Sequence, residues 1–153
     1  KVWNAPVLSQ EILDIYTPKV EIRTEYTLGD HPYLANGSEM YGDDVRNLFE
    51  AFRKEVLAID PCVTETFLKF YVAYKAETNF VDVVPQAKRL RLSLNIKFSD
   101  IDDEKGLSKD ISRLGRWGNG DVEVGLSKIE ELPYVMGLIR QAYEKQMGQD
   151  IDL

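Results

Sequence analysis

Apolar and polar residues alternate most regularly between residues 89 and 98, where the sequence reads RLRLSLNIKF. Successive side chains of a β-strand point to opposite faces, so this alternation predicts a strand with one apolar and one polar face. The apolar face would hold Leu90, Leu92, Leu94 and Ile96. The polar face would hold Arg89, Arg91, Ser93, Asn95 and Lys97.

Further strands are predicted around this one. Residues 70–76 (FYVAYKA), 80–84 (FVDVV) and 122–126 (VEVGL) are rich in β-branched and aromatic residues. Short turns between the successive strands favour an antiparallel meander. Residues 20–26 (VEIRTEY) also alternate, which favours a strand that would either add to the edge of this sheet or belong to a neighbouring domain. We therefore expect an antiparallel sheet of four to five strands.

Helical periodicity precedes the predicted sheet. Residues 45–59 carry apolar side chains at helical spacing, which gives one apolar helix face. Asp60 and Pro61 would end this helix and begin a second short one that runs to Phe70, because proline is tolerated at the first position of a helix. The sequence thus predicts an N-terminal helical pair.

A second periodic stretch follows the sheet. Ser127 and Glu130 fit a capping box, and apolar residues then recur at helical spacing as far as Gly148. This pattern predicts a long C-terminal helix. The expected fold class is therefore α+β, with an antiparallel sheet flanked by the N-terminal helical pair and the long C-terminal helix.

Length and charge narrow the class of protein. The 153 residues suit one domain at 43–148, with a linker or extension at 1–42 and a tail at 149–153. A net charge of −7 argues against broad coating of DNA, which needs many phosphate contacts. No apolar run approaches the roughly 20 residues that span a bilayer. The single cysteine cannot form an internal disulfide, and we expect a cytoplasmic protein with no membrane partner.

Basic residues concentrate near the polar face of the strand at 89–98, and no acidic residue occurs between residues 86 and 97. A glycine-bracketed segment at 115–120 (GRWGNG) adds an arginine and a tryptophan. Arginine beside an exposed aromatic ring suits a phosphate and a stacked base. The candidate nucleic-acid-binding residues are Lys88, Arg89, Arg91, Arg116, Trp117, Lys75 and Tyr74.

Two alternatives for the same residues stay open. The cations of the polar face would instead pair with the acidic loop at residues 100–104, leaving an ordinary solvated sheet face. Trp117 would instead fill the sheet edge, with the neighbouring glycines forming the turn.

The acidic loop is a second candidate for chemistry. Asp100, Asp102 and Asp103 would hold Mg²⁺ in a nuclease, but the spacing of a calcium-binding EF-hand loop is absent. Capping and turn roles are the alternative that we favour. The chain has no Ser-His-Asp set, Cys-His pair or H-x-x-x-H motif. We therefore predict no catalytic residue, no metal and no cofactor.

Five segments carry a resemblance to a known family: FEAFRKEVLAIDPCV, YVAYKAETNFVDVVPQAKRLRLSLNI, DIDDEKG, LGRWGNGDVEVGL and YVMGLIRQAYEK. Over residues 41–146 the chain resembles an uncharacterised bacterial domain family, a domain of unknown function sometimes labelled "predicted transport protein". The resemblance implies a domain that occurs alone or at the C-terminus of longer proteins. Some of those resemble restriction enzymes with a ParB-like and an HNH nuclease domain. The resemblance supplies no catalytic residues.

Three functional hypotheses follow. The first is a non-catalytic nucleic-acid-binding or target-sensing module of a larger bacterial defence or restriction-type protein. The second is a protein-interaction or oligomerisation domain, and the third is a metal-dependent nuclease. The partners that these hypotheses imply are DNA or RNA, other domains of the same longer chain, and a second copy of the chain.

Overall fold

The computed structural model describes residues 25–35, 44–114 and 120–148. Its centre is a six-stranded sheet in the order β1-β2-β3-β4-β6-β5, and every pair of neighbours is antiparallel. The strands are β1 (Thr64–Phe67), β2 (Val72–Lys75), β3 (Asn79–Pro85), β4 (Leu90–Leu94), β5 (Lys109–Asp110) and β6 (Val122–Leu126).

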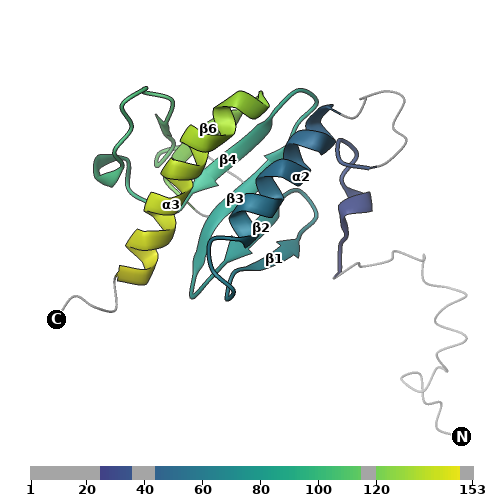
Figure 1. The fold of residues 1–153 in the computed structure, drawn as a ribbon, viewed down its shortest axis with the longest axis horizontal. Helices are drawn as coiled ribbons and strands as arrows, with labels where there is room; N and C mark the ends of the chain where they lie inside the picture. Colours follow the sequence, from purple (N-terminus) through teal and green to yellow (C-terminus); the bar gives the residue numbers. More distant parts are fainter. Residues whose placement is uncertain (1–24, 36–43, 115–119, 149–153) are drawn as a thin grey trace, which may run out of the picture.

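Two α-helices, α2 (Asp44–Leu57) and α3 (Leu132–Gly148), lie over the same face of this sheet (Figure 1). Three short 3₁₀ turns complete the described elements: η1 (Leu28–Asp30), η2 (Phe98–Asp100) and η3 (Ile129–Glu131). We call the opposite face of the sheet, which carries Asp82, Arg91, Ser93 and Glu123, the polar face. The expected α+β class, antiparallel sheet and long C-terminal helix are confirmed.

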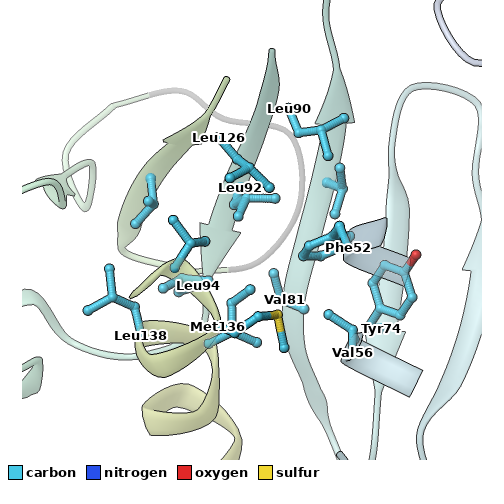
Figure 2. Packing of buried hydrophobic residues seen from close by; sticks show 14 of the residues in the cluster. Phe52, Val56, Tyr74, Val81, Leu90, Leu92, Leu94, Leu126, Met136 and Leu138 are labelled. Atoms are coloured by element: carbon cyan, nitrogen blue, oxygen red, sulfur yellow. The ribbon is translucent and has the colours of Figure 1, made fainter. Parts of the chain in front are cut away.

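The core lies between the helices and the sheet. Leu90, Leu92 and Leu94 of β4 are fully buried, as the alternation in the sequence predicted. They meet the apolar stripes of the two helices, including Phe52 of α2 and Met136 of α3 (Figure 2). Fully burying such side chains stabilises a fold by about 1.5–3 kcal/mol each, so this contact is the main reason the layers stay together.

The sheet has six strands rather than four to five, and the N-terminal helical pair is a single helix. Residues 64–67, expected to be helical, form β1, in which exposed and half-buried residues alternate. The threonines at its two exposed positions favour a strand, and Pro61 lies in a turn instead of starting a helix. Residues 109–110, outside the strands predicted from the sequence, form β5 on the edge of β6.

The start of the C-terminal helix also differs in detail. η3 precedes α3, and the cap is made by Glu131 rather than by Glu130. The Glu131 Oε1 accepts hydrogen bonds from the backbone N–H of Ser127 at 2.9 Å and of Lys128 at 2.8 Å. The capping carboxylate is therefore one residue later than the motif predicted.

The described part of the expected N-terminal linker packs on the domain. Leu34 is fully buried in the core, and the Arg46 guanidinium of α2 donates a hydrogen bond to its carbonyl at 2.7 Å. The edge strand expected at 20–26 lies mostly outside the described residues. Its last two residues, Glu25 and Tyr26, are described and belong to no strand.

We predict that Tyr74→Phe lowers the free energy of unfolding by about 1 kcal/mol, because a buried hydrogen bond is lost. The Tyr74 side chain has 0% exposure, its hydroxyl donates to Glu65 Oε2 at 2.8 Å, and its ring meets Phe52 edge-on at 5.6 Å. Urea unfolding would show a lower midpoint with an unchanged slope. Tyr71→Phe, at a half-buried tyrosine just before β2, is the control; an equal loss in both variants would contradict the prediction.

Candidate functional site

β4 positions the basic residues that the sequence singled out. It crosses the centre of the sheet between β3 and β6, and its outward side chains, Arg91 and Ser93, lie on the polar face. A tight turn at residues 86–89 leads into β4, closed by a backbone hydrogen bond from the Gln86 N–H to the Arg89 carbonyl at 2.9 Å. Lys88 lies exposed in this turn. The turn thus brings Lys88 and Arg89 next to Arg91.

The Arg89 side chain reaches over the neighbouring strand β6, and its guanidinium is held in place there. Its Nε donates to Gln86 Oε1 at 2.7 Å. A Cβ added to Gly125, on β6, would lie only 2.7 Å from Arg89 Nη1. The absence of a side chain at Gly125 therefore leaves the space that the guanidinium fills. Among the described residues no carboxylate lies within ion-pairing distance of Arg89, so its two terminal nitrogens keep donors for a ligand.

Arg91 is only partly compensated. Its Nε lies 3.8 Å from Glu123 Oε1 on β6, which is an ion pair but too long for a hydrogen bond. The same Nε is buried and has no hydrogen-bond partner, although 24% of the side chain is exposed. Arg91 therefore pairs with a residue of the neighbouring strand. It does not pair with the acidic loop at 100–104, as the alternative interpretation of the sequence expected.

The polar face is not uniformly accessible. Asp82 and Ser93, at its centre, are buried, and the Asn79 amide donates to Asp82 Oδ1 at 2.7 Å. Exposed and half-exposed cations gather instead at the end of the sheet where β3 turns into β4. We call this end, with Lys88, Arg89 and Arg91, the arginine end.

The structure separates the other predicted site residues. Tyr74 faces the helices and is fully buried. It therefore does not line the polar face, contrary to the prediction from the sequence. The reason is the register of β2, in which Tyr74 pairs with Val81 beneath α2 (Figure 2). Lys75 is exposed but pairs with Asn79 at the far end of the strands, about 20 Å from Arg89 by strand rise. Arg116 and Trp117 lie outside the described residues.

The acidic loop is fastened to α3. Asp103 accepts hydrogen bonds from the Ser108 N–H and hydroxyl, each at 2.6 Å, and from the Tyr134 hydroxyl. The Asp102 N–H donates to Gln141 Oε1 at 2.7 Å, and Asp100 pairs with Lys145 at 3.8 Å. Within residues 25–35, 44–114 and 120–148, no group of three or more His, Cys, Asp or Glu side chains is placed to hold a metal ion.

Sequence reasoning missed a cavity beside the arginine end. Its wall joins residues 31–33 to the β1–β2 turn and to the end of β3. The strand predicted at 70–76 begins only at Val72, which leaves Phe70 exposed in the turn. The sequence signal was weak: His31 is followed by Pro32 and Tyr33, and histidine and tyrosine are only intermediate in their tendency to be buried.

Together these features define an α+β domain with helices on one side of its sheet and a partly compensated arginine pair on the other. The chain belongs to the family described as a domain of unknown function (DUF5655), whose model matches residues 32–146. That match includes Leu34, which the structure places in the core.

A relative is known in Haemophilus influenzae, where the protein is described as uncharacterized. It is 34% identical over 139 residues, which cover 91% of this chain and 44% of that protein. The chain therefore spans less than half the length of this relative. No solved structure matches the chain. None of the helices described is long and apolar enough to cross a membrane.

We predict that Asp103→Asn destabilises the domain at neutral pH much more than at acid pH. Burial acts to raise the pKa of Asp103, but its hydrogen bonds from Ser108 and Tyr134 outweigh burial and lower it. A lowered pKa gives stability that is present above the unfolded value of about 3.9 and is lost as the pH falls through the folded pKa.

Urea unfolding at pH 7 and near pH 3 would test this. The difference between wild type and Asp103→Asn should shrink at the lower pH. Asp102→Asn is the matched control, because the Asp102 contacts to α3 come from its backbone. A pH-independent difference would contradict the assignment of Asp103 as the charged partner of Ser108 and Tyr134.

Proposed function

We propose that this domain is a non-catalytic nucleic-acid-binding or target-sensing module that contacts phosphate at the arginine end. One observation carries the proposal: the Arg89 guanidinium is positioned by Gln86 and by the gap at Gly125, yet has no carboxylate partner among the described residues. A guanidinium fixed in this way matches the two oxygens of a phosphate and loses little conformational freedom when it binds.

The neighbouring residues support the same ligand. Arg89 and Arg91 are two residues apart on an extended chain, so their Cα atoms are separated by about 7 Å. Both can therefore contact one phosphate or two successive phosphates, and Lys88 adds an exposed charge in the same turn. Arg91 adds a second, partly exposed guanidinium whose ion pair with Glu123 is too long for a hydrogen bond.

The number of cations limits the mode of binding. Two or three phosphate contacts on a chain of net charge −7 support weak, salt-sensitive binding at one spot rather than coating of a duplex. Such binding suits an accessory module of a larger bacterial protein, and the longer Haemophilus influenzae relative supports that setting. The defence or restriction context remains part of this proposal and rests on the family resemblance.

We expect Arg89→Ala to weaken binding of a short single-stranded oligonucleotide by about tenfold, because a charge-assisted hydrogen bond pair is lost. The slope of log affinity against log salt should fall by about 0.7, as one phosphate contact disappears. Fluorescence anisotropy across several salt concentrations measures both quantities. Arg140→Ala removes the same charge from the exposed surface of α3 and is the matched control.

In the same assay, Gly125→Ala tests whether the position of the Arg89 guanidinium matters independently of its charge. The added Cβ would displace the Arg89 guanidinium while every charge remains, so affinity should fall several-fold without loss of folding stability. If Arg89→Ala and Arg140→Ala bind alike, or if Gly125→Ala binds as the wild type does, the arginine end is not the phosphate site.

A second candidate function is self-association through the sheet edge. β1 is an outer strand of the sheet, and its Thr64 and Thr66 are exposed. An outer strand offers backbone donors and acceptors to another chain. If this is the function, light scattering should show a mass that doubles as concentration rises through the micromolar range. A constant monomer mass over that range would exclude it.

A further inference from the structure

A cavity of about 200 Å³ opens beside the arginine end. The residues that line it include His31, Tyr33, Lys69, Phe70, Val84 and Pro85. Three segments far apart in the sequence therefore contribute to it: the described N-terminal stretch, the β1–β2 turn and the last residues of β3. Sites for drug-sized ligands enclose roughly 300–1,000 Å³, so this cavity suits one small flat group.

The cavity adjoins the residues proposed to hold phosphate. Val84, in its wall, pairs with Arg91 across the sheet, and Pro85 pairs with Leu90. Adjacent strands lie about 5 Å apart, so Arg91 on β4 is one strand spacing from the β3 wall of the cavity, and the Arg89 guanidinium, beside Gly125 of β6, is about two. That reach matches the length of a single nucleotide better than it matches an isolated anion.

The lining favours an aromatic ring. Phe70 is 48% exposed, and the Lys69 Nζ lies 5.2 Å from its ring centroid. Tyr33, which is half-buried, also lines the cavity, and proline and valine supply the rest of the apolar surface. Aromatic side chains stack on every base, because every base has a π-face, and a lysine beside them adds attraction for the attached phosphate.

His31 supplies a specific polar contact. Its side chain is 3% exposed, and one ring nitrogen is hydrogen-bonded to the backbone of Leu68. Its Nε2 is buried and has no partner. Desolvation lowers the pKa of His31, so the imidazole is neutral at pH 7, and with the other nitrogen donating to the Leu68 carbonyl the Nε2 is an acceptor. An N–H on the edge of a base would satisfy it.

We infer that this cavity takes one unstacked base of a single-stranded nucleic acid whose phosphates lie on Arg89 and Arg91. The inference rests on the proposed function and makes it more specific, because a base within a duplex cannot enter such a pocket. Lys69 would then lie beside the sugar-phosphate of the bound nucleotide, and the arginine end would hold the next phosphate along the strand.

The single histidine of the chain offers a direct test. The imidazole protons of His31 give the only histidine signals in the NMR spectrum, so they report on this cavity alone. A single-stranded adenine hexanucleotide should shift these signals at saturation. An abasic hexamer with the same backbone should bind the arginine end and leave them unchanged.

Anisotropy with the same two probes gives the energetic counterpart. The wild type should bind the adenine hexamer about tenfold more tightly than the abasic one, as expected for one stacked base. Phe70→Leu keeps an apolar side chain but removes the flat ring, so it should abolish this preference without weakening the abasic probe. Arg89→Ala should weaken both probes equally.

The outcomes distinguish the base pocket from the phosphate site. If both hexamers bind equally through Arg89 and His31 does not respond, the base pocket is wrong and the phosphate site stands. If neither hexamer depends on Arg89, the proposed function is wrong; a response of His31 to the adenine hexamer alone would then keep only the base pocket. A silent His31 in that case overturns both.

Discussion

The alternation of β4 is the constraint on which the rest of the structure depends. Leu90, Leu92 and Leu94 fill the core beneath α2 and α3, and β4 is hydrogen-bonded on both sides, to β3 and to β6. A slip of one residue would expose three leucines and push Arg91 into the core. Losing each leucine from the core costs about 1.5–3 kcal/mol, and burying an uncompensated charge costs more, so the register is fixed.

The same register builds the arginine end. Because Arg91 lies opposite Gly125 and Ser93 opposite Glu123, one alignment of β4 with β6 produces two effects. It brings a carboxylate near Arg91 without letting it form a good hydrogen bond, and it leaves space above Gly125 for the Arg89 guanidinium. The packing that stabilises the core therefore also sets how much positive charge remains uncompensated on the other face.

The sequence predicted the elements whose hydrophobic pattern is strong and long. β4, β6, α2 and α3 each bury a regular set of apolar side chains, so their positions follow from periodicity. β1 and β5 were missed because they are short edge strands whose residues are half-buried or exposed, which leaves little apolar signal. Pro61 favoured a helix locally, and pairing with β2 decided otherwise.

The candidate site was predictable only in part. The shared face of Arg89 and Arg91 follows from their spacing of two. Their environment does not, because it depends on β6, which is about thirty residues further along the chain and joins β4 only in the folded sheet. The sequence also does not show which face of the sheet Tyr74 occupies. Residues 70–76 carry apolar or aromatic side chains at both odd and even positions, so the sequence does not show which set of side chains faces the helices.

The acidic net charge does not conflict with a local site for phosphate. Several carboxylates are engaged within the domain: Glu65 pairs with Arg53 at 2.8 Å, Asp60 accepts from the Tyr143 hydroxyl at 2.5 Å, and Asp103 is bound by Ser108. At physiological salt, charges separated by more than about 8 Å are largely screened from one another. A phosphate at the proposed site would therefore interact mainly with the immediate neighbours of Arg89, and the remaining acidic surface would oppose adsorption elsewhere on the chain. Under the proposed function, the site would gain discrimination in this way at the expense of affinity, which linkage to a second binding element would restore.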